Sequence, residues 1–325
     1  MAATRATTLM CYAPSGGGKT SQIANMARYV YEKWGKKTRL ISASGGGWAP
    51  IEREGLVEAG IVEPFDIRNR PQALADVRRL SDGYWPRIVT EGGRKIRKFS
   101  SDEVCKVTPT EWRGIGLVAV ECIQSIATAL IGHIADTNSA EKVGYARVTY
   151  DEAEYTFGST DKGHVGLVQR ELQKLVVKGF GSLPVEFVMF TSLVGKGEDK
   201  RTGDTIYGPD SIGTALTHVI PSWVGDCFHL DILPPQDGGD SPLGQYVAWY
   251  VKHPDPITGV EYKCKVRVSP RETAALFGAY PNGYIPLTTE VGIDGFYRFL
   301  DKLGSSTAEA TKSWKDKIDK ARQKE

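Results

Sequence analysis

Short, almost continuously apolar runs recur along the first two thirds of the chain. They cover residues 7–12, 38–43, 114–123, 185–193 and 226–233. Runs of this kind are typical of strands that are buried on both faces of a parallel sheet. Between the runs, apolar residues recur at helical spacing, which predicts helices over 20–34, 49–60, 70–81, 123–135, 164–178 and 211–219. The alternation of strands and helices predicts an α/β fold whose mostly parallel sheet is flanked by helices.

Three segments interrupt this alternation. Residues 84–110 alternate polar and apolar positions around Gly92-Gly93, which predicts an inserted β-hairpin. Residues 136–163 and 194–213 are polar and contain several glycines, so we expect both to be long loops. Long loops inside a folded core are more often functional than decorative.

The pattern changes after Pro234. Residues 245–268 alternate as a second hairpin, and short helices are expected at 270–277 and 293–303. We therefore divide the chain into a core at 1–233 with its hairpin insertion at about 84–110, a small β-hairpin and helix extension at 234–303, and a charged helical tail at 304–325.

Composition describes an ordinary globular chain. Its 325 residues carry a formal net charge of +2, too small to indicate nucleic-acid binding without local clusters. No apolar run reaches the roughly 18 residues of a membrane span, and we expect no membrane partner and no signal peptide. The five cysteines are dispersed without a C-x-x-C pair, which disfavours a disulfide framework. These features favour the cytoplasm, or the host cytoplasm if the protein is viral.

Residues 11–22, CYAPSGGGKTSQ, fit the P-loop pattern with alanine at the position of the first glycine. Glycines lack a Cβ atom, so the backbone can turn its N–H groups toward phosphate oxygens. Lys19 can reach the β- and γ-phosphates, and the Thr20 hydroxyl can bind Mg²⁺. The motif predicts a nucleoside triphosphate with Mg²⁺, held by Ala13, Pro14, Ser15, Gly16, Gly17, Gly18, Lys19, Thr20 and Ser21.

A P-loop enzyme also needs a carboxylate at the end of a buried strand to hold Mg²⁺ and its water shell. Glu121 ends the apolar run LVAV and would lie beside the P-loop if the two strands are neighbours. An unpaired charge in a buried strand is costly without a partner, which favours Glu121 as a metal ligand. Thr191 and Ser192 end another strand and are candidates to contact the γ-phosphate or the attacking water.

The order of these parts resembles the RecA superfamily of P-loop ATPases. Within it, the chain is similar to the short RecA-like ATPases of bacteriophages, some of which act in single-strand annealing and recombination. The resemblance covers residues 5–233. It is carried by APSGGGKT, by GLVAVECI, by GLVQRELQKL leading into VEFVMFTS, and by GDTIYGPDSIGTALTHVIPSWVGDCFHLDIL. It implies an ATP-hydrolysing protein that acts as a ring or filament.

The same resemblance implies DNA contacts. In RecA itself, two loops line the DNA channel, and the corresponding segments here are about 136–163 and 195–210. Lys196, Lys200 and Arg201 then become candidates for contacting DNA phosphates or a neighbouring subunit's nucleotide.

The chain departs from the family pattern at two positions where the family has acidic residues. The family's catalytic glutamate ends the strand after the P-loop helix, where this chain has Ser44 and Gly45. Glu52 and Glu54 follow closely and are possible substitutes. The family's usual aspartate is replaced by Glu121. Both departures predict slow hydrolysis, or hydrolysis that depends on a neighbouring subunit.

A second basic cluster lies on the predicted hairpin, at Arg94, Lys95, Arg97 and Lys98. Such a cluster could contact a DNA backbone, and Tyr84, Trp85 and Phe99 beside it could stack on bases. The alternative is a solvated edge hairpin whose charges discourage edge-to-edge pairing.

Two functions remain open. The first is a slow, oligomeric, ATP-dependent protein that acts on single-stranded DNA in recombination, annealing or replication. In it Lys19, Glu121 and Thr191 serve catalysis, and Thr20 and Glu121 hold Mg²⁺. The second is a structural or regulatory protein whose nucleotide stabilises an assembly with little hydrolysis and no DNA. Stimulation of phosphate release by single-stranded DNA separates the two.

Overall fold

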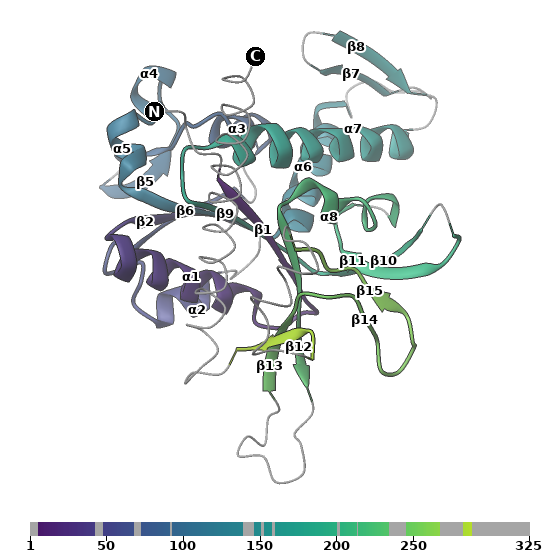
Figure 1. Ribbon diagram of the computed structural model, residues 1–325. Helices are drawn as coiled ribbons and strands as arrows, with labels where there is room; N and C mark the ends of the chain where they lie inside the picture. Colours follow the sequence, from purple (N-terminus) through teal and green to yellow (C-terminus); the bar gives the residue numbers. More distant parts are fainter. Residues whose placement is uncertain are drawn as a thin grey trace, which may run out of the picture.

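The computed structural model shows a central sheet with helices on both of its faces (Figure 1). The residues it describes are 6–42, 48–67, 73–91, 93–138, 146–150, 153–157, 160–199, 202–212, 214–233, 245–266 and 282–287. None of the helices in these ranges combines the length and apolar composition that crossing a lipid bilayer requires.

Within these residues, the main sheet has eight strands in the order β16-β13-β12-β1-β9-β6-β2-β3. Their bounds are β1 Thr7–Tyr12, β2 Lys37–Ser42, β3 Val62–Asp66, β6 Ile115–Glu121, β9 Phe187–Ser192, β12 Asp226–Leu233, β13 Gln245–Trp249 and β16 Tyr284–Pro286. From β12 to β3 all neighbours run parallel, whereas β13 and β16 pair antiparallel at one edge. The expected α/β fold is confirmed, and the carboxyl ends of the parallel strands meet at one edge of the sheet.

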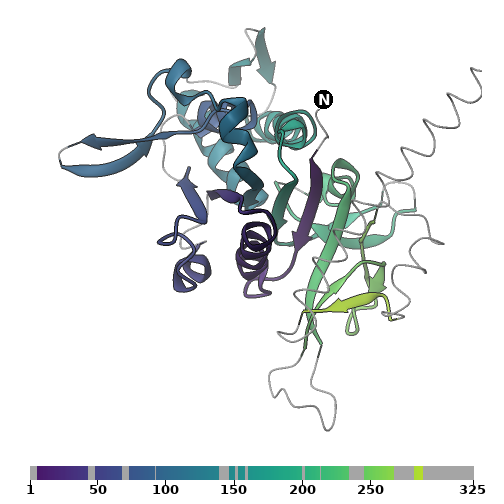
Figure 2. The same cartoon turned by 60° about the vertical axis from the view of Figure 1, so that its left-hand side comes forward.

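Helices cover the two faces unequally (Figure 2). One face packs against α1 (Lys19–Trp34) and the short α2 (Ala49–Arg53), the other against α3 (Ala73–Ser81), α6 (Ile123–Asn138) and α7 (Thr160–Lys174). Ile23 and Val30 of α1 are fully buried, together with Cys11 of β1, in the hydrophobic core on the first of these faces. This burial holds α1 against the sheet, because its apolar stripe packs on the strands and shares a core with Ile51 of α2.

The predicted insertion contains the expected hairpin, formed by β4 (Arg87–Glu91) and β5 (Arg94–Lys98). It also contains α4 (Asp102–Cys105) and α5 (Pro109–Arg113), which the sequence pattern did not predict. A capping box that joins Thr108 and Glu111 begins α5. The T-x-x-E spacing was present in the sequence, but the four-to-five-residue helices are too short for a periodic signal.

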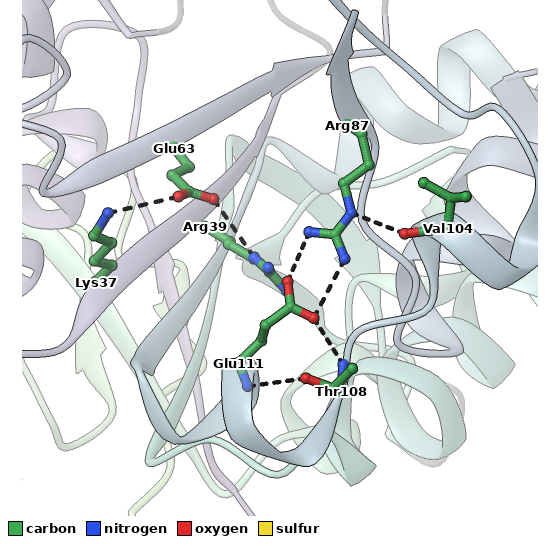
Figure 3. A network of polar contacts seen from close by, with 7 residues as sticks. All are labelled: Lys37, Arg39, Glu63, Arg87, Val104, Thr108 and Glu111. Carbon is green, nitrogen blue, oxygen red and sulfur yellow. Dashed lines mark hydrogen bonds and ion pairs between the residues drawn. The ribbon is translucent and has the colours of Figure 1, made fainter.

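Charged groups of strands β2 and β3 lie close to charged groups of the insertion and of α5 (Figure 3). Arg39 of β2 is only 3% exposed, and its guanidinium lies 4.9 Å from the Trp85 ring and 5.1 Å from the Trp112 ring. Arg87 donates two hydrogen bonds of 2.7 and 3.2 Å to the Glu111 carboxylate, which lower the pKa of Glu111 to about 2. The cation–π contacts of Arg39 therefore join β2 to Trp85 and to α5, and the Arg87–Glu111 ion pair joins β4 to α5.

The largest corrections concern segments expected to be loops. Residues 194–213 contain a hairpin of β10 (Val194–Glu198) and β11 (Thr205–Pro209), and residues 136–163 contain another, of β7 (Ala146–Tyr150) and β8 (Ala153–Phe157). Strand β3 was not predicted either, because VEPFD is short and mixed in polarity. In all three, strand pairing overrides a weak local pattern.

Other elements differ in extent. The helix expected at 49–60 ends at Arg53 and continues as turns, and the one expected at 211–219 is a 3₁₀ turn at Thr214–Leu216 followed by α8 at Ile220–Trp223. The helix expected at 164–178 begins at Thr160, and its end is a π-helical turn at Leu175–Gly179 followed by a 3₁₀ turn at Phe180–Ser182.

Residues 245–268 do not form one hairpin. β13 pairs with β12 and β16, whereas β14 (His253–Pro254) and β15 (Glu261–Tyr262) pair with each other and join β11 and β10 in a second sheet. The helices expected at 270–277 and 293–303, and the tail at 304–325, lie outside the described residues. The division of the chain at Pro234 stays a prediction.

The close approach of α1 to β6 gives a first testable prediction. A Cβ atom at Gly116 would lie 2.5 Å from Cγ1 of Val30, whose branched side chain cannot move aside easily. We expect Gly116→Ala to lower the free energy of unfolding by about 1–3 kcal/mol in urea titrations. Gly166→Ala in α7, where a Cβ would meet nothing within 4 Å, is the control and should be neutral or stabilising. Equal effects of the two substitutions would contradict this packing.

Candidate functional site

The P-loop joins β1 to α1 at the carboxyl edge of the sheet, in the strand–loop–helix context that the motif requires. Gly16 and Gly18 both have φ of 80°, in the left-handed region that side chains disfavour. A Cβ at Gly17 would lie 2.6 Å from the Ala13 side chain, so this position also excludes larger residues. No side chain among the described residues caps α1, and its first N–H groups are left for another acceptor.

Lys19 lies over the loop that it follows. Its Nζ donates hydrogen bonds to the backbone carbonyls of Pro14, at 2.8 Å, and Ala13, at 3.2 Å. Burial lowers the pKa of Lys19, while the negative charges that Cys122 and Glu121 can carry act in the opposite direction. The ammonium group is thus held in the concave side of the P-loop, where a phosphate would meet it.

Thr20, in the first turn of the helix that follows β1, contacts Glu121 at the end of β6, although β1 and β6 are not neighbours. The sequence placed Glu121 beside the P-loop on the condition that β1 and β6 are neighbours, and that condition is not met, because β9 lies between them. The Thr20 Oγ1 donates a hydrogen bond to Oε1 of Glu121. The first turn of α1 therefore reaches across β9 to the end of β6.

The carboxyl group of Glu121 is only 4% exposed, and its second oxygen, Oε2, has no hydrogen-bond partner among the described residues. Burial raises the pKa of Glu121 to about 7, against the opposing effects of the Thr20 hydrogen bond and the Lys19 charge. An orphaned carboxylate oxygen beside a threonine hydroxyl fits a hard divalent cation such as Mg²⁺, which prefers oxygen ligands.

Thr191 and Ser192, at the end of β9, have different surroundings. Thr191 is fully buried, and its Oγ1 has no partner among the described residues. Because side chains alternate along a strand, Thr191 points to the α1 side of the sheet, as Glu121 does. Ser192 instead donates its hydroxyl to the carbonyls of Asp210 and Leu193. Thr191 is thus the better placed of the two to meet a ligand.

The acid that is missing from the end of β2 has no close replacement among the described residues. Ser42 ends β2 directly opposite Glu121, and Ser44 and Gly45 lie outside the described residues. Glu54 forms an ion pair with Arg28, nine residues beyond Lys19 along α1, which is about 13 Å of helix. Glu52 is exposed on α2.

The basic candidates lie on two hairpins. Lys196 is exposed on β10, whereas Lys200 and Arg201 lie outside the described residues. Arg94 and Lys95 are placed on β5 by the backbone, and Arg97 and Lys98 are partly exposed there. The structure does not bring the two sets together: they belong to separate sheets.

The aromatic residues next to the first hairpin are buried to different extents. Trp85 is 3% exposed and packs against Phe65 and Arg39. Phe99 packs edge-on against Phe65, with ring centroids 5.7 Å apart. From the sequence, Tyr84, Trp85 and Phe99 were candidates to stack on bases. The burial of Trp85 argues against it, Phe99 is only partly buried, and Tyr84 is partly exposed with Lys106 Nζ 5.9 Å from its ring centroid.

One polar contact near the site was missed entirely. Gln124, three residues after Glu121, donates a 2.6 Å hydrogen bond from Nε2 to Oδ2 of Asp210, just beyond β11. Burial raises the pKa of the Asp210 carboxyl. The contact ties the β10–β11 hairpin to the end of β6, and no local signal announces a pair separated by 86 residues.

Comparisons with known proteins add one finding. No family model and no curated protein matches the chain. Among solved structures, the chain is similar to the KaiC-like protein PH0186 from the hyperthermophilic archaeon Pyrococcus horikoshii OT3, with 10% sequence identity and a TM-score of 0.38. The similarity covers 75% of this chain and 78% of that one. The fold assignment above rests on strand order and on the position of the P-loop.

The buried carboxyl of Glu121 gives a second prediction. Folding raises its pKa from 4.5 to about 7. The stability that the protonated carboxyl group contributes is therefore complete below pH 4.5 and is lost as the pH rises through 7. Without metal or nucleotide, we expect Glu121→Gln to gain stability over the natural chain by about 3 kcal/mol between pH 5 and pH 8. Urea unfolding in EDTA at several pH values measures this difference.

Glu198→Gln, on exposed β10, controls for the loss of a surface charge. A stability difference between Glu121→Gln and the natural chain that stays constant with pH would contradict the raised pKa.

Proposed function

We propose that the chain binds ATP with Mg²⁺ at the P-loop and hydrolyses it slowly. The observation that carries this proposal is the convergence of three groups from two elements. Lys19 and Thr20 come from the start of α1, and the orphaned Glu121 carboxylate comes from the end of β6. Packing alone would give both oxygens of a buried carboxyl group a hydrogen-bond partner, rather than leave Oε2 without one among the described residues.

Each residue has a distinct part in this proposal. The backbone N–H groups from Gly16 to Lys19 donate to phosphate oxygens, and the Lys19 ammonium exchanges its carbonyl partners for the β- and γ-phosphates. Thr20 and Glu121 would hold Mg²⁺, which would offset negative charge on the phosphate oxygens. Because the pKa of Glu121 is about 7 without a ligand, its carboxyl proton must leave when the metal binds.

Slow turnover follows from what surrounds the γ-phosphate position. Thr191 offers a hydroxyl there, which can orient a water but is a poor general base. Ser42, not an acid, ends β2 opposite Glu121. A group from a neighbouring subunit would raise the rate, which is why we propose a homo-oligomer, a ring or filament, as the active form.

We further propose that the partner is single-stranded DNA, as in a recombination or annealing protein of phage type. The support is the β4–β5 hairpin, which projects from the body of the molecule (Figure 2) and carries Arg94, Lys95, Arg97 and Lys98. Because Trp85 is enclosed in the core and Phe99 is partly buried against it, DNA contacts here would be mainly electrostatic, and the partly exposed Tyr84 is the remaining candidate for base stacking. Lys196 on exposed β10 is a second candidate contact.

A nucleotide-stabilised assembly without DNA is the alternative. The burial of Trp85 favours it, because it removes one of the three side chains expected to stack on bases beside the basic hairpin. Strong stimulation of phosphate release by single-stranded DNA would reject this alternative. ATP that remains intact after long incubation would reject the hydrolytic part of the proposal.

The third prediction tests the phosphate site. Lys19→Ala should weaken Mg²⁺–ATP binding about 10- to 150-fold by calorimetry, the range for the loss of a hydrogen-bonded charge. Lys33→Ala removes a lysine from the last turn of the same helix and should leave the affinity unchanged. Equal affinity of Lys19→Ala and the natural chain would reject the site.

The fourth prediction tests the basic hairpin. Removing two charges with Arg97→Ala and Lys98→Ala should reduce the slope of log affinity against log salt by about 1.4 for single-stranded DNA. The control replaces two exposed cations elsewhere, Arg53 on α2 and Lys178 after α7, with alanine. An unchanged slope in the hairpin variant, or the same reduction in the control, would reject the proposal that DNA binds at this hairpin.

A further inference from the structure

An exposed tyrosine from the C-terminal third of the chain lies against the P-loop. Tyr246 on β13 keeps 40% of its surface exposed. A Cβ atom placed on Gly18 would lie 3.7 Å from Cε1 and 3.8 Å from Cδ1 of its ring. Gly18 directly precedes Lys19, so this ring borders the phosphate cradle.

The strand that carries Tyr246 extends past the end of β1. Tyr12, the last residue of β1, pairs in register with His229 of β12, and β12 continues four residues further, to Leu233. Four strand residues span about 13 Å. β13 runs back along this overhang, with Tyr246 directly opposite Ile232. The β12–β13 ribbon therefore forms a wall beside the P-loop, at the lower edge of the sheet in Figure 2.

Two residues of this wall, Ile232 and Tyr246, face the same side of the sheet as α1. Leu230 and Ala248 are opposite each other, fully buried, and belong to the core that α1 covers. Because strand side chains alternate, Ile232 and Tyr246, two positions further, share that face. They are 39% and 40% exposed. An apolar pair thus stands open on the side of the sheet where the N-terminus of α1 presents its N–H groups.

The backbone under Tyr246 is held on both sides. Ladder bonds join it to β12, and its carbonyl oxygen accepts a 2.7 Å hydrogen bond from the N–H of Leu287. Neighbours on the same strand, Val247 and Ala248, are fully buried. The ring therefore stands on a rigid support, which reduces the entropy lost when a ligand packs on it.

We infer that Tyr246, supported by Ile232, is the surface on which the base of the bound nucleotide stacks. This inference rests on the proposed function, because it needs a triphosphate in the P-loop. The ribose joins the base directly to the α-phosphate, so the base lies one sugar away from the cradle. Tyr246 borders the cradle and offers an aromatic face of the kind that stacks on any nucleobase.

The inference gives a role to a part of the chain that the sequence left without one. The N-terminal segment holds the phosphates, and Tyr246, from beyond Pro234, stacks on the base. A ligand with the same phosphates but no base should therefore lose the contribution of Tyr246.

The test compares two ligands, Mg²⁺–ATP and Mg²⁺–tripolyphosphate, by calorimetry on the full chain. The variants are Tyr246→Ala, Tyr246→Phe and Ile232→Ala. The control is Tyr31→Ala, since Tyr31 is also an exposed tyrosine, at 42%, but lies twelve residues beyond Lys19 on α1. Thermal melting of each variant checks that it is folded.

We expect Tyr246→Ala to weaken ATP binding about 5- to 150-fold, the range for loss of one base–aromatic stack, while tripolyphosphate affinity stays within twofold. Ile232→Ala should give a smaller loss for ATP alone, and Tyr246→Phe and Tyr31→Ala should bind ATP within twofold of the natural chain. Equal losses for both ligands in Tyr246→Ala, or no loss, would overturn the inference. So would a Tyr246→Phe variant as weak as Tyr246→Ala, because the hydroxyl would then be the contact.

Failure of the proposed function looks different. If the natural chain binds neither ATP nor tripolyphosphate, the phosphate site is wrong and the base surface falls with it. If the natural chain binds both and Tyr246→Ala changes neither, only the base surface is wrong.

A second measurement needs no variant. Photolysis of the natural chain with 8-azido-ATP should label a peptide from β12 or β13, and excess ATP should prevent the labelling. ATP-protected label confined to peptides outside these two strands would overturn the inference.

Discussion

The site depends on one buried interaction, the hydrogen bond from the Thr20 hydroxyl to the carboxyl group of Glu121. It joins the first turn of α1 to the end of β6 across an intervening strand. The contact exists only because α1 packs tightly on the sheet, where Gly116 leaves room for Val30. Burial makes the carboxyl group costly to ionise, and a cation bound at its open oxygen would remove that cost.

The sequence was sufficient where local chemistry dictates the structure. Gly16 and Gly18 adopt the positive φ that the P-loop motif predicts, and the apolar run that ends in Glu121 is a buried strand. The partner strand of β6 could not be predicted, because strand order is decided by packing between distant segments. For that reason the position of Glu121 beside the P-loop was tied to a pairing of β1 with β6, whereas β9 separates these two strands.

Glycines in the segment 194–213 show why its hairpin was missed. The sequence pattern attributes them to a flexible loop, but the structure uses them for close packing. A Cβ at Gly197 would lie 2.8 Å from that of Thr217, and one at Gly208 would lie 2.7 Å from the Thr217 carbonyl oxygen. A glycine needed for space and one needed for flexibility are identical in a sequence. Trp85 was misplaced for a related reason, since its neighbours gave no sign that Arg39 would be buried beside it.

The chain thus combines a phosphate cradle predicted from local sequence with a wall that only the fold reveals. The most direct test is a crystal structure with a non-hydrolysable ATP analogue and Mn²⁺, whose anomalous scattering locates the metal. The account predicts phosphates on the N–H groups from Gly16 to Lys19, and an anomalous peak within coordination distance of the Thr20 and Glu121 oxygens. A P-loop that stays empty at millimolar analogue, or a metal bound away from Glu121, would contradict it.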